Sequence, residues 1–177
     1  MLSVSAYTKE AYCEALLALS ERKELAKITV SDVVRECGTS RQTFYNHFKD
    51  INNLISYLPI SVMSHYQGNA LSRESVELAY GYALDHRAFF RQLPALTGQN
   101  NFRETFIGWA RRTYYEGFLD ESMSMHEYTL RSLAIDLYVA GVVNQFLEWC
   151  AADFSWPLKA MVEVQYAAAP DFIKTAE

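Results

Sequence analysis

The chain has 177 residues and a formal net charge of −5 at pH 7, and half of its residues are hydrophobic. This length allows one domain or two small ones with a substantial core, and the acidic balance excludes a protein that coats nucleic acid without sequence preference. No apolar run reaches the ~18 residues of a membrane span, so we expect no membrane association.

The charge is divided unevenly along the chain. Residues 1–68 carry seven Lys and Arg and seven Asp and Glu, whereas residues 69–177 carry nine and fourteen. A neutral first part with exposed cations can still dock on DNA while the acidic remainder is held away from the phosphates. The three cysteines are odd in number and far apart, and no signal peptide precedes them. We therefore expect free thiols and a cytoplasmic protein.

Helical periodicity with few Gly and Pro predicts an all-α protein. The first predicted helix covers residues 8–22, with Thr8 as its cap and an apolar face that begins at Tyr12. We expect it to pack behind the next two helices.

Residues 28–49 read ITVSDVVRECGTSRQTFYNHFK and contain two short helical patterns, 29–37 and 40–48. Gly38 lies between them, where the chain must bend sharply. Two helices joined by a three- or four-residue turn that contains Gly are typical of a helix-turn-helix, whose second helix enters the DNA major groove.

A longer helix is predicted from residue 50 to about 66, with a kink or break at Pro59 because proline removes a helical hydrogen bond. Gly68 and Asn69 are helix breakers, and we place the boundary between the two domains near residues 59–69. The remaining predicted helices cover residues 73–86, 87–93, 102–119, 125–152 and 155–169, the last with Ser155 as its cap.

This order of elements resembles the TetR/AcrR family of transcriptional regulators. The resemblance rests on ITVSDVVRECGTSRQTFYNHFKDINNL, residues 28–54, where the Thr-Val-x-Asp opening, the Gly-x-Ser turn and the T-F-Y-x-H-F-K run occur in order. It implies an N-terminal helix-turn-helix three-helix DNA-binding domain, residues 1–50, followed by a helical ligand-binding and dimerisation domain, residues 51–177, with a connecting helix at about 50–67. Cys37 departs from the family by standing where a small residue such as Ala is common, and we expect it to be buried rather than redox-active.

Base readout is expected from the first turn of the second helix. The amide of Gln42 can donate and accept at once, which suits adenine N6 and N7. Arg41 suits either guanine or a phosphate, and Thr43 suits a thymine methyl group.

Phosphate contacts are implied by the resemblance at Tyr45, His47 and Lys49. Hydroxyl or backbone N–H contacts are expected from Thr29, Thr39 and Ser40. Thr29 and Ser40 are equally suited to be helix caps, and the two roles can coexist. His47 can also be an inert surface residue, and Tyr45 a core residue.

One short helix reads only a few base pairs, so we expect a homodimer on a palindromic operator in double-stranded DNA. The resemblance implies a dimer interface on the last two long helices. The alternative is that these helices complete the core of each monomer. The candidate interface residues are Leu133, Leu137, Gly141, Trp156 and Met161.

The second part of the chain is rich in aromatic residues, most of which must be core. The resemblance implies a small-molecule effector, and an aromatic lining suits a hydrophobic or aromatic one. The candidate ligand contacts are His65, Phe106, Trp109, Tyr114, Asn144 and Gln145.

The resemblance implies a ligand-responsive repressor. Two rival functions belong to other classes. An enzyme is disfavoured because the sequence has no HExxH, CxxC or Gly-rich phosphate loop, and we expect neither cofactor nor metal. A TetR-like co-regulator that binds another protein rather than DNA is the alternative, which the cationic and polar residues of 41–49 disfavour.

Overall fold

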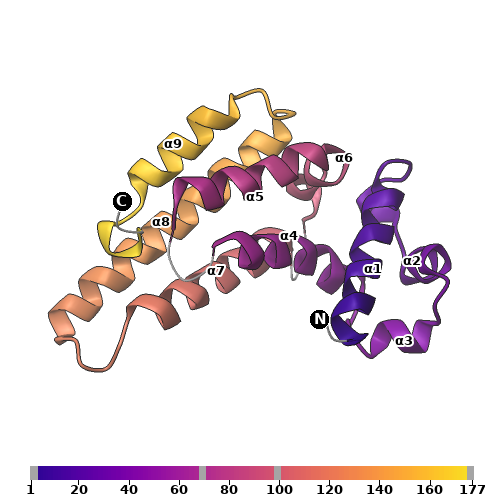
Figure 1. The fold of residues 1–177 in the computed structure, drawn as a ribbon, viewed down its shortest axis with the longest axis horizontal. Coiled ribbons are helices and arrows are strands. Elements are labelled where there is room, and N and C mark those ends of the chain that lie inside the picture. Colours follow the sequence, from indigo (N-terminus) through magenta and orange to yellow (C-terminus); the bar gives the residue numbers. More distant parts are fainter. Residues whose placement is uncertain (1–3, 68–70, 98–100, 175–177) are drawn as a thin grey trace.

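The computed structural model describes residues 4–67, 71–97 and 101–174, and these residues form an all-helical fold (Figure 1). One isolated bridge between Leu71 and Lys174 is the only strand-like pairing among them. The helices, with three short 3₁₀ segments (η), are α1 Val4–Ser20, η1 Leu25–Lys27, α2 Val30–Cys37, α3 Arg41–Tyr45, α4 Ile51–Gln67, α5 Arg73–Asp85, α6 Arg87–Phe90, η2 Leu93–Ala95, α7 Phe102–Phe118, α8 Met125–Ala151, α9 Leu158–Ala168 and η3 Asp171–Ile173. The all-α expectation is confirmed.

The first three helices form a small head at one end of the molecule (Figure 1). Its core is an aromatic cluster built around Tyr12 of α1, which is fully buried. The Tyr12 ring meets Phe44 edge-on at a centroid distance of 5.4 Å and Phe48 at 6.0 Å. Phe44 and Phe48 are four residues apart, so both side chains point to the same side of α3 and the turn after it. Their contacts with Tyr12 fix this segment against α1.

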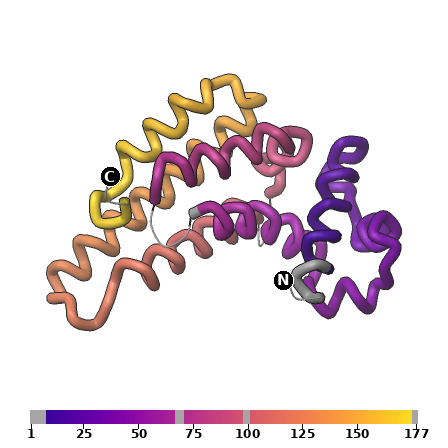
Figure 2. The backbone as a smooth tube through the Cα atoms, viewed as in Figure 1, coloured from indigo at the N-terminus to yellow at the C-terminus, as the bar shows by residue number. Residues whose placement is uncertain are grey.

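The remaining helices form the body, in which α7 packs against α8 and α5 packs against α9. Its centre is also aromatic, since Tyr80 of α5 stacks on Trp149 of α8 at 5.5 Å and meets Phe146 at 5.2 Å. The helix α4 joins head and body, because it packs on α1 at one end and on α5 and α7 along the rest (Figure 2). A change in the body can therefore reach the head through one continuous helix.

Five local expectations differ from the structure. The helix α1 covers Val4–Ser20 instead of residues 8–22, so Thr8 lies inside it and is not its cap. The helix α3 ends at Tyr45 instead of residue 48, because the chain tightens there and the His47 N–H bonds back three residues to the Phe44 carbonyl. The helix α4 continues through Pro59 without a break, since neighbouring helices hold both halves. The last helix starts at Leu158 after Pro157, so Ser155 is not its cap. The predicted helix over 87–93 stops at Phe90, and a separate 3₁₀ turn follows.

The helices over residues 73–86, 102–119 and 125–152 are confirmed to within one residue at each end. The predicted breakers Gly68 and Asn69 lie outside the described residues.

Candidate nucleic-acid interface

The two helices of the predicted helix-turn-helix are each fixed by a side-chain cap. The hydroxyl of Thr29 accepts the Asp32 N–H at 3.3 Å, and the Asp32 carboxylate accepts the Thr29 N–H at 2.9 Å, which completes a capping box. Gly38 ends α2 at φ 66°, a left-handed conformation that costs glycine little. Ser40 then caps α3 by accepting the Thr43 N–H at 3.1 Å. The turn and the start of α3 are therefore determined locally.

The expected base-reading residues share the solvent face of α3. Arg41 and Gln42 are exposed, whereas Phe44 of the same helix is fully buried. Within the described residues the Gln42 amide makes only a long 3.4 Å hydrogen bond to Asn46, so it remains available to a base edge. Thr43 is half-buried, and its hydroxyl lies 2.9 Å from that of Ser40.

The expected phosphate contacts lie along the rim of this face. Tyr45 is 48% exposed, which excludes the core role for it, and Lys49 is exposed as well. His47 is half-buried, with its ring 6.3 Å from that of Tyr12. The Thr39 hydroxyl lies 3.1 Å from the Tyr12 hydroxyl, so it supports the turn from inside the head.

Charge on the head is arranged so that free cations remain beside α3. Four cations elsewhere on the head pair with carboxylates: Arg22 with Glu36, Lys23 with Asp32, Lys27 with Glu24 and Arg35 with Asp32. Arg41 and Lys49 make no ion pair within the part of the chain that the structure describes, and residues 37–49 include no Asp or Glu. The face of α3 therefore offers uncompensated positive charge, as phosphate binding requires.

Cys37 at the end of α2 is half-buried, and its thiol donates to the Ala11 carbonyl at 3.3 Å. Burial raises the pKa of Cys37 to about 11 and, in α1, that of Cys13 to about 12. Both thiols are therefore protonated at neutral pH, as inert packing groups are.

Two adjoining cavities of about 30 Å³ each lie inside the body between α4, α5, α6, α7, α8 and α9. Three of the expected ligand contacts line them: Phe106 borders both, and Trp109 and Tyr114 border the second. The structure places His65, Asn144 and Gln145 outside these walls, although Asn144 lines a separate cleft of about 350 Å³, so their ligand contacts stay predictions.

Each of those three residues has another environment. His65 is exposed against the Tyr66 ring, Gln145 is half-buried at the surface of α8, and Asn144 accepts a hydrogen bond from Arg103 at 3.0 Å. Helical periodicity identified the helix correctly but not the side of it that faces the cavity.

Besides Tyr80 and Tyr114, the polar lining of the cavities comes from two residues that the sequence did not single out as ligand contacts, Tyr138 of α8 and Gln165 of α9. Both are buried, at 6% and 2% exposure. A buried Gln among apolar positions of the last helix was the available signal, because Gln is rarely buried without a role. Burial raises the pKa of Tyr138 and of Tyr80, so both hydroxyls keep their protons.

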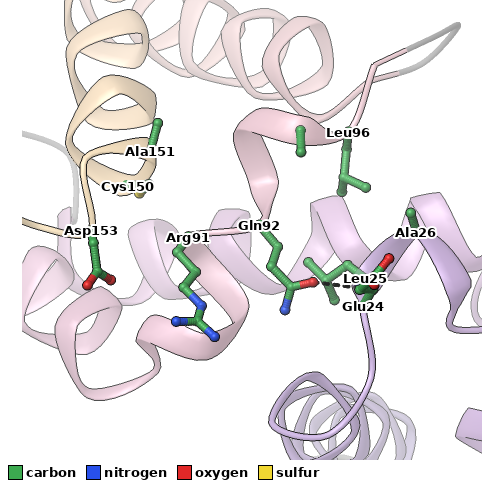
Figure 3. A pocket seen from close by; sticks show the side chains of 10 residues that line it. Glu24, Leu25, Ala26, Arg91, Gln92, Leu96, Cys150, Ala151 and Asp153 are labelled. Atoms are coloured by element: carbon green, nitrogen blue, oxygen red, sulfur yellow. Dashed lines mark hydrogen bonds between the residues drawn. The ribbon is translucent and has the colours of Figure 1, made fainter.

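A more open cleft of about 450 Å³ separates the head from the body (Figure 3). Gln92, between α6 and η2, spans its floor: its carboxamide oxygen accepts the Leu25 N–H at 2.8 Å, and its nitrogen donates to the Ala88 carbonyl at 2.7 Å and the Ser20 carbonyl at 3.4 Å. These bonds tie the end of α1 and η1 to α6, so Gln92 is a second link between head and body.

The expected dimer residues divide into two groups. Leu133 and Leu137 lie on one face of α8 and are 61% and 79% exposed, and Trp156 is 40% exposed. Gly141 is exposed on the same helix, and a Cβ added there would meet nothing within 4 Å. Met161, in contrast, is 3% exposed in a single chain, so it packs in the core and we remove it from the interface. We call the residues Met125, Leu130, Leu133, Leu137 and Gly141 the α8 face.

Among the described residues no cluster of three His, Cys, Asp or Glu side chains could hold a metal ion. No helix among them is both long and apolar enough to cross a lipid bilayer.

Comparison with known proteins agrees with this geometry. Residues 14–58 match the family model described as "Bacterial regulatory proteins, tetR family". Two solved structures share the fold over nearly the whole chain. The dihydroxyacetone kinase operon activator DhaS is 18% identical, with a TM-score of 0.61, and the match covers 90% of this chain and 92% of that one. The TetR family repressor AlkX from Dietzia sp. strain DQ12-45-1b is 14% identical, with a TM-score of 0.51, covering 96% of this chain and 99% of that one. No curated protein sequence matches.

Proposed function

The chain belongs to the TetR family of bacterial regulatory proteins and is a DNA-binding transcription regulator, and from this premise we propose that it represses transcription as an effector-responsive homodimer on a palindromic operator. One observation carries the DNA part of the proposal: Arg41 and Gln42 are exposed on α3, Lys49 is exposed shortly after it, and neither cation makes an ion pair in the part of the chain that the structure describes. Electrostatic docking and base readout need this combination of cations and a bidentate amide.

We assign the residues of this interface by their exposure and chemistry. Gln42 reads adenine, Arg41 reads guanine or binds a phosphate, and Thr43 contacts a thymine methyl group. Tyr45, His47 and Lys49 bind phosphates, as do backbone or hydroxyl groups of the two cap residues and the turn: Thr29, Thr39 and Ser40. Because the Thr39 N–H already donates to the Val34 carbonyl at 2.9 Å, its contribution comes from the hydroxyl, which can accept from the Tyr12 hydroxyl and donate to a phosphate.

Dimerisation supplies the second recognition helix. The α8 face presents large exposed apolar side chains in a row, which a soluble monomer rarely leaves uncovered. Covering this face with its copy would bring two heads to one side of the dimer, with α3 helices about 34–36 Å apart on successive major grooves.

Effector response requires that the ligand bind two states of the dimer with different affinity. The aromatic cavities are bordered by Pro59, Val62 and Met63 of α4, which is also the helix that packs on α1. We therefore propose that a small apolar effector displaces this part of α4 and turns the heads. Proline lacks one helical hydrogen bond and so makes bending cheaper at this point.

Replacing Pro59 with Ala tests whether bending of α4 at this residue transmits the effector response. The added hydrogen bond should stiffen α4 and weaken the effector-induced loss of DNA binding several-fold, measured by titrating an operator complex with effector. An unchanged response would remove Pro59 from the mechanism.

The alternative function is a co-regulator that contacts another protein instead of DNA. The two structural neighbours include an operon activator and a repressor, so the fold alone does not choose the sign of regulation. The test is a gel shift with the intergenic DNA flanking the gene of this chain. A salt-sensitive complex that unlabelled specific fragment competes away, and random DNA does not, supports the regulator. No complex with DNA, together with a complex with a second transcription factor, supports the co-regulator.

A further inference from the structure

The effector cavities are unusually uniform in chemistry. Their walls are mainly the aliphatic and aromatic side chains of six helices, and five residues border both cavities: Met63, Phe106, Val142, Val143 and Gln165. No Lys, Arg, Asp, Glu or His lines either cavity. A charged ligand would lose its hydration here and gain no counter-ion, which excludes carboxylates, phosphates and ammonium compounds.

Three tyrosines and one glutamine interrupt these apolar walls: Tyr80 lines the first cavity, Tyr114 and Tyr138 line the second, and Gln165 lines both. The Tyr138 hydroxyl and the Gln165 carboxamide oxygen are the only buried side-chain N or O atoms without a hydrogen-bond partner among the described residues. The Gln165 carboxamide interacts with the Tyr80 and Tyr138 hydroxyls, but neither its oxygen nor the Tyr138 hydroxyl has a partner at hydrogen-bond geometry. Buried polar groups without partners are rare because each loses its bond to water on folding.

Both unsatisfied atoms belong to the same cavity, although they come from different helices, α8 and α9. A hydroxyl group both donates and accepts, so one hydroxyl could bond to Gln165 and Tyr138 together. If the Gln165 carboxamide is flipped, so that its nitrogen takes the place of its oxygen, the same hydroxyl can accept from that nitrogen and donate to the Tyr138 hydroxyl instead.

We infer that this cavity binds a neutral, mainly apolar molecule that carries a single hydroxyl group, which donates to the Gln165 carboxamide oxygen and accepts from the Tyr138 hydroxyl. This inference rests on the proposed function, since it names the chemical class of the proposed effector. The aromatic walls, with Phe106 and Trp109 5.3 Å apart, suit a phenol ring, which can stack on either.

The ligand enlarges the cavity as it enters. Each free volume of about 30 Å³ holds little more than a water molecule. Met63 of α4 borders both volumes, and Met is unbranched and adaptable. Its displacement would join the two volumes at the helix that leads to the head.

The binding test uses the full chain and three probes of one shape: 4-propylphenol, propylbenzene and 4-propylbenzoate. Quenching of tryptophan fluorescence reports occupancy, since Trp109 lines the cavity. We expect 4-propylphenol to bind roughly tenfold or more tightly than propylbenzene, and 4-propylbenzoate not to bind measurably. Equal binding of the first two probes, tighter binding of the benzoate, or no binding of any probe would overturn the inference.

Two variants locate the hydroxyl. Tyr138→Phe and Gln165→Met each remove one partner at nearly constant volume, so each should weaken 4-propylphenol roughly tenfold and leave propylbenzene unchanged. Tyr82→Phe is the matched control, because Tyr82 of α5 lines neither cavity, and it should change neither affinity. Loss of affinity for both probes alike would mean that the variants only disturb packing, which contradicts the assignment.

Thermal stability gives an independent readout without ligand. If the Tyr138 hydroxyl is unsatisfied in the free protein, Tyr138→Phe should leave the midpoint of thermal unfolding unchanged or raise it. A fall of several degrees would mean that a buried water already bonds to this hydroxyl and that the pair is structural.

Operator binding measured without ligand distinguishes failure of the proposed function from failure of this inference about the effector. The three variants should bind operator DNA like the original chain, since none lies in the head. If operator binding is intact and the hydroxyl preference is absent, only this inference fails; if operator binding itself is absent, the proposed function fails.

Discussion

The head and the body of this regulator are specified in different ways. In the head, short helices are fixed by partners three residues away, Thr29 with Asp32 and Ser40 with Thr43. In the body, the decisive contacts join residues far apart in sequence, such as Tyr80 with Trp149. The difference teaches that a DNA-binding helix-turn-helix can be inferred from a contiguous run of residues, whereas the cavities of the body exist only once the helices have packed.

The largest effect is expected from substitutions in the body, which should prevent tight operator binding although the head is unchanged. The double variant Leu133→Glu, Leu137→Glu places charges on the α8 face and should convert a dimer to a monomer. Loss of the second recognition helix should weaken operator binding by about 100-fold or more. Sedimentation and gel shift measure the two effects.

Leu78→Glu is the matched control for this variant, because Leu78 is an exposed leucine of α5 outside the α8 face. It should remain dimeric and bind DNA normally. A monomeric original chain that still binds one operator tightly would contradict the prediction.

The next effect belongs to the head alone. Gln42→Ala should cost about 1–3 kcal/mol at one base pair of each half-site and relax the preference there, with little change on non-specific DNA. Binding to a set of single-base operator variants measures this. A uniform loss at every position would assign Gln42 to phosphate contact instead.

Lys49→Ala should have a smaller, sequence-independent effect. Removing one phosphate contact per head lowers the slope of log affinity against log salt by about 1 per contact, for all sequences alike. Lys27→Ala makes the same charge change at a lysine paired with Glu24 away from α3, and its slope should stay nearly that of the original chain. Equal slopes for the two variants would remove Lys49 from the interface.

The smallest effect concerns the stability of the head. Hydrogen bonds from Lys23 and Thr29 hold the pKa of Asp32 well below its usual range. Asp32 therefore stabilises the fold above its unfolded pKa of about 3.9, and this contribution is lost as pH falls toward the folded value. Asp32→Asn should cost about 1 kcal/mol at pH 7 and lose less stability than the original chain between pH 5 and 3. Denaturant unfolding at several pH values measures this, and parallel pH profiles would contradict it.

The same contrast explains how far the sequence could lead. The caps at Thr29 and Ser40 and the sharp bend at Gly38 were predicted because each depends on residues within one turn. The bounds of the long helices followed from periodicity. The early end of α3 and the start of α9 after Pro157 were missed, because tertiary packing and local tightening determine them.

The lining of the body cavities was predicted only in part for the same reason. Phe106, Trp109 and Tyr114 were identified because the apolar side of α7 must face inward. The polar residues were misplaced, since Asn144 and Gln145 are on the outer side of α8 while Tyr138 faces inward. Gln165 escaped attention because only the packed structure reveals that its carbonyl oxygen has no partner.

The most direct test of the central claim, that two copies joined through α8 read DNA with α3, is selection of bound sequences from a random double-stranded DNA library. The account predicts an enriched inverted repeat whose half-sites are centred about one helical turn, or a whole number of turns, apart, and loss of the repeat with the Leu133→Glu, Leu137→Glu variant. Enrichment of a single unrepeated motif, or of no sequence at all, would contradict it.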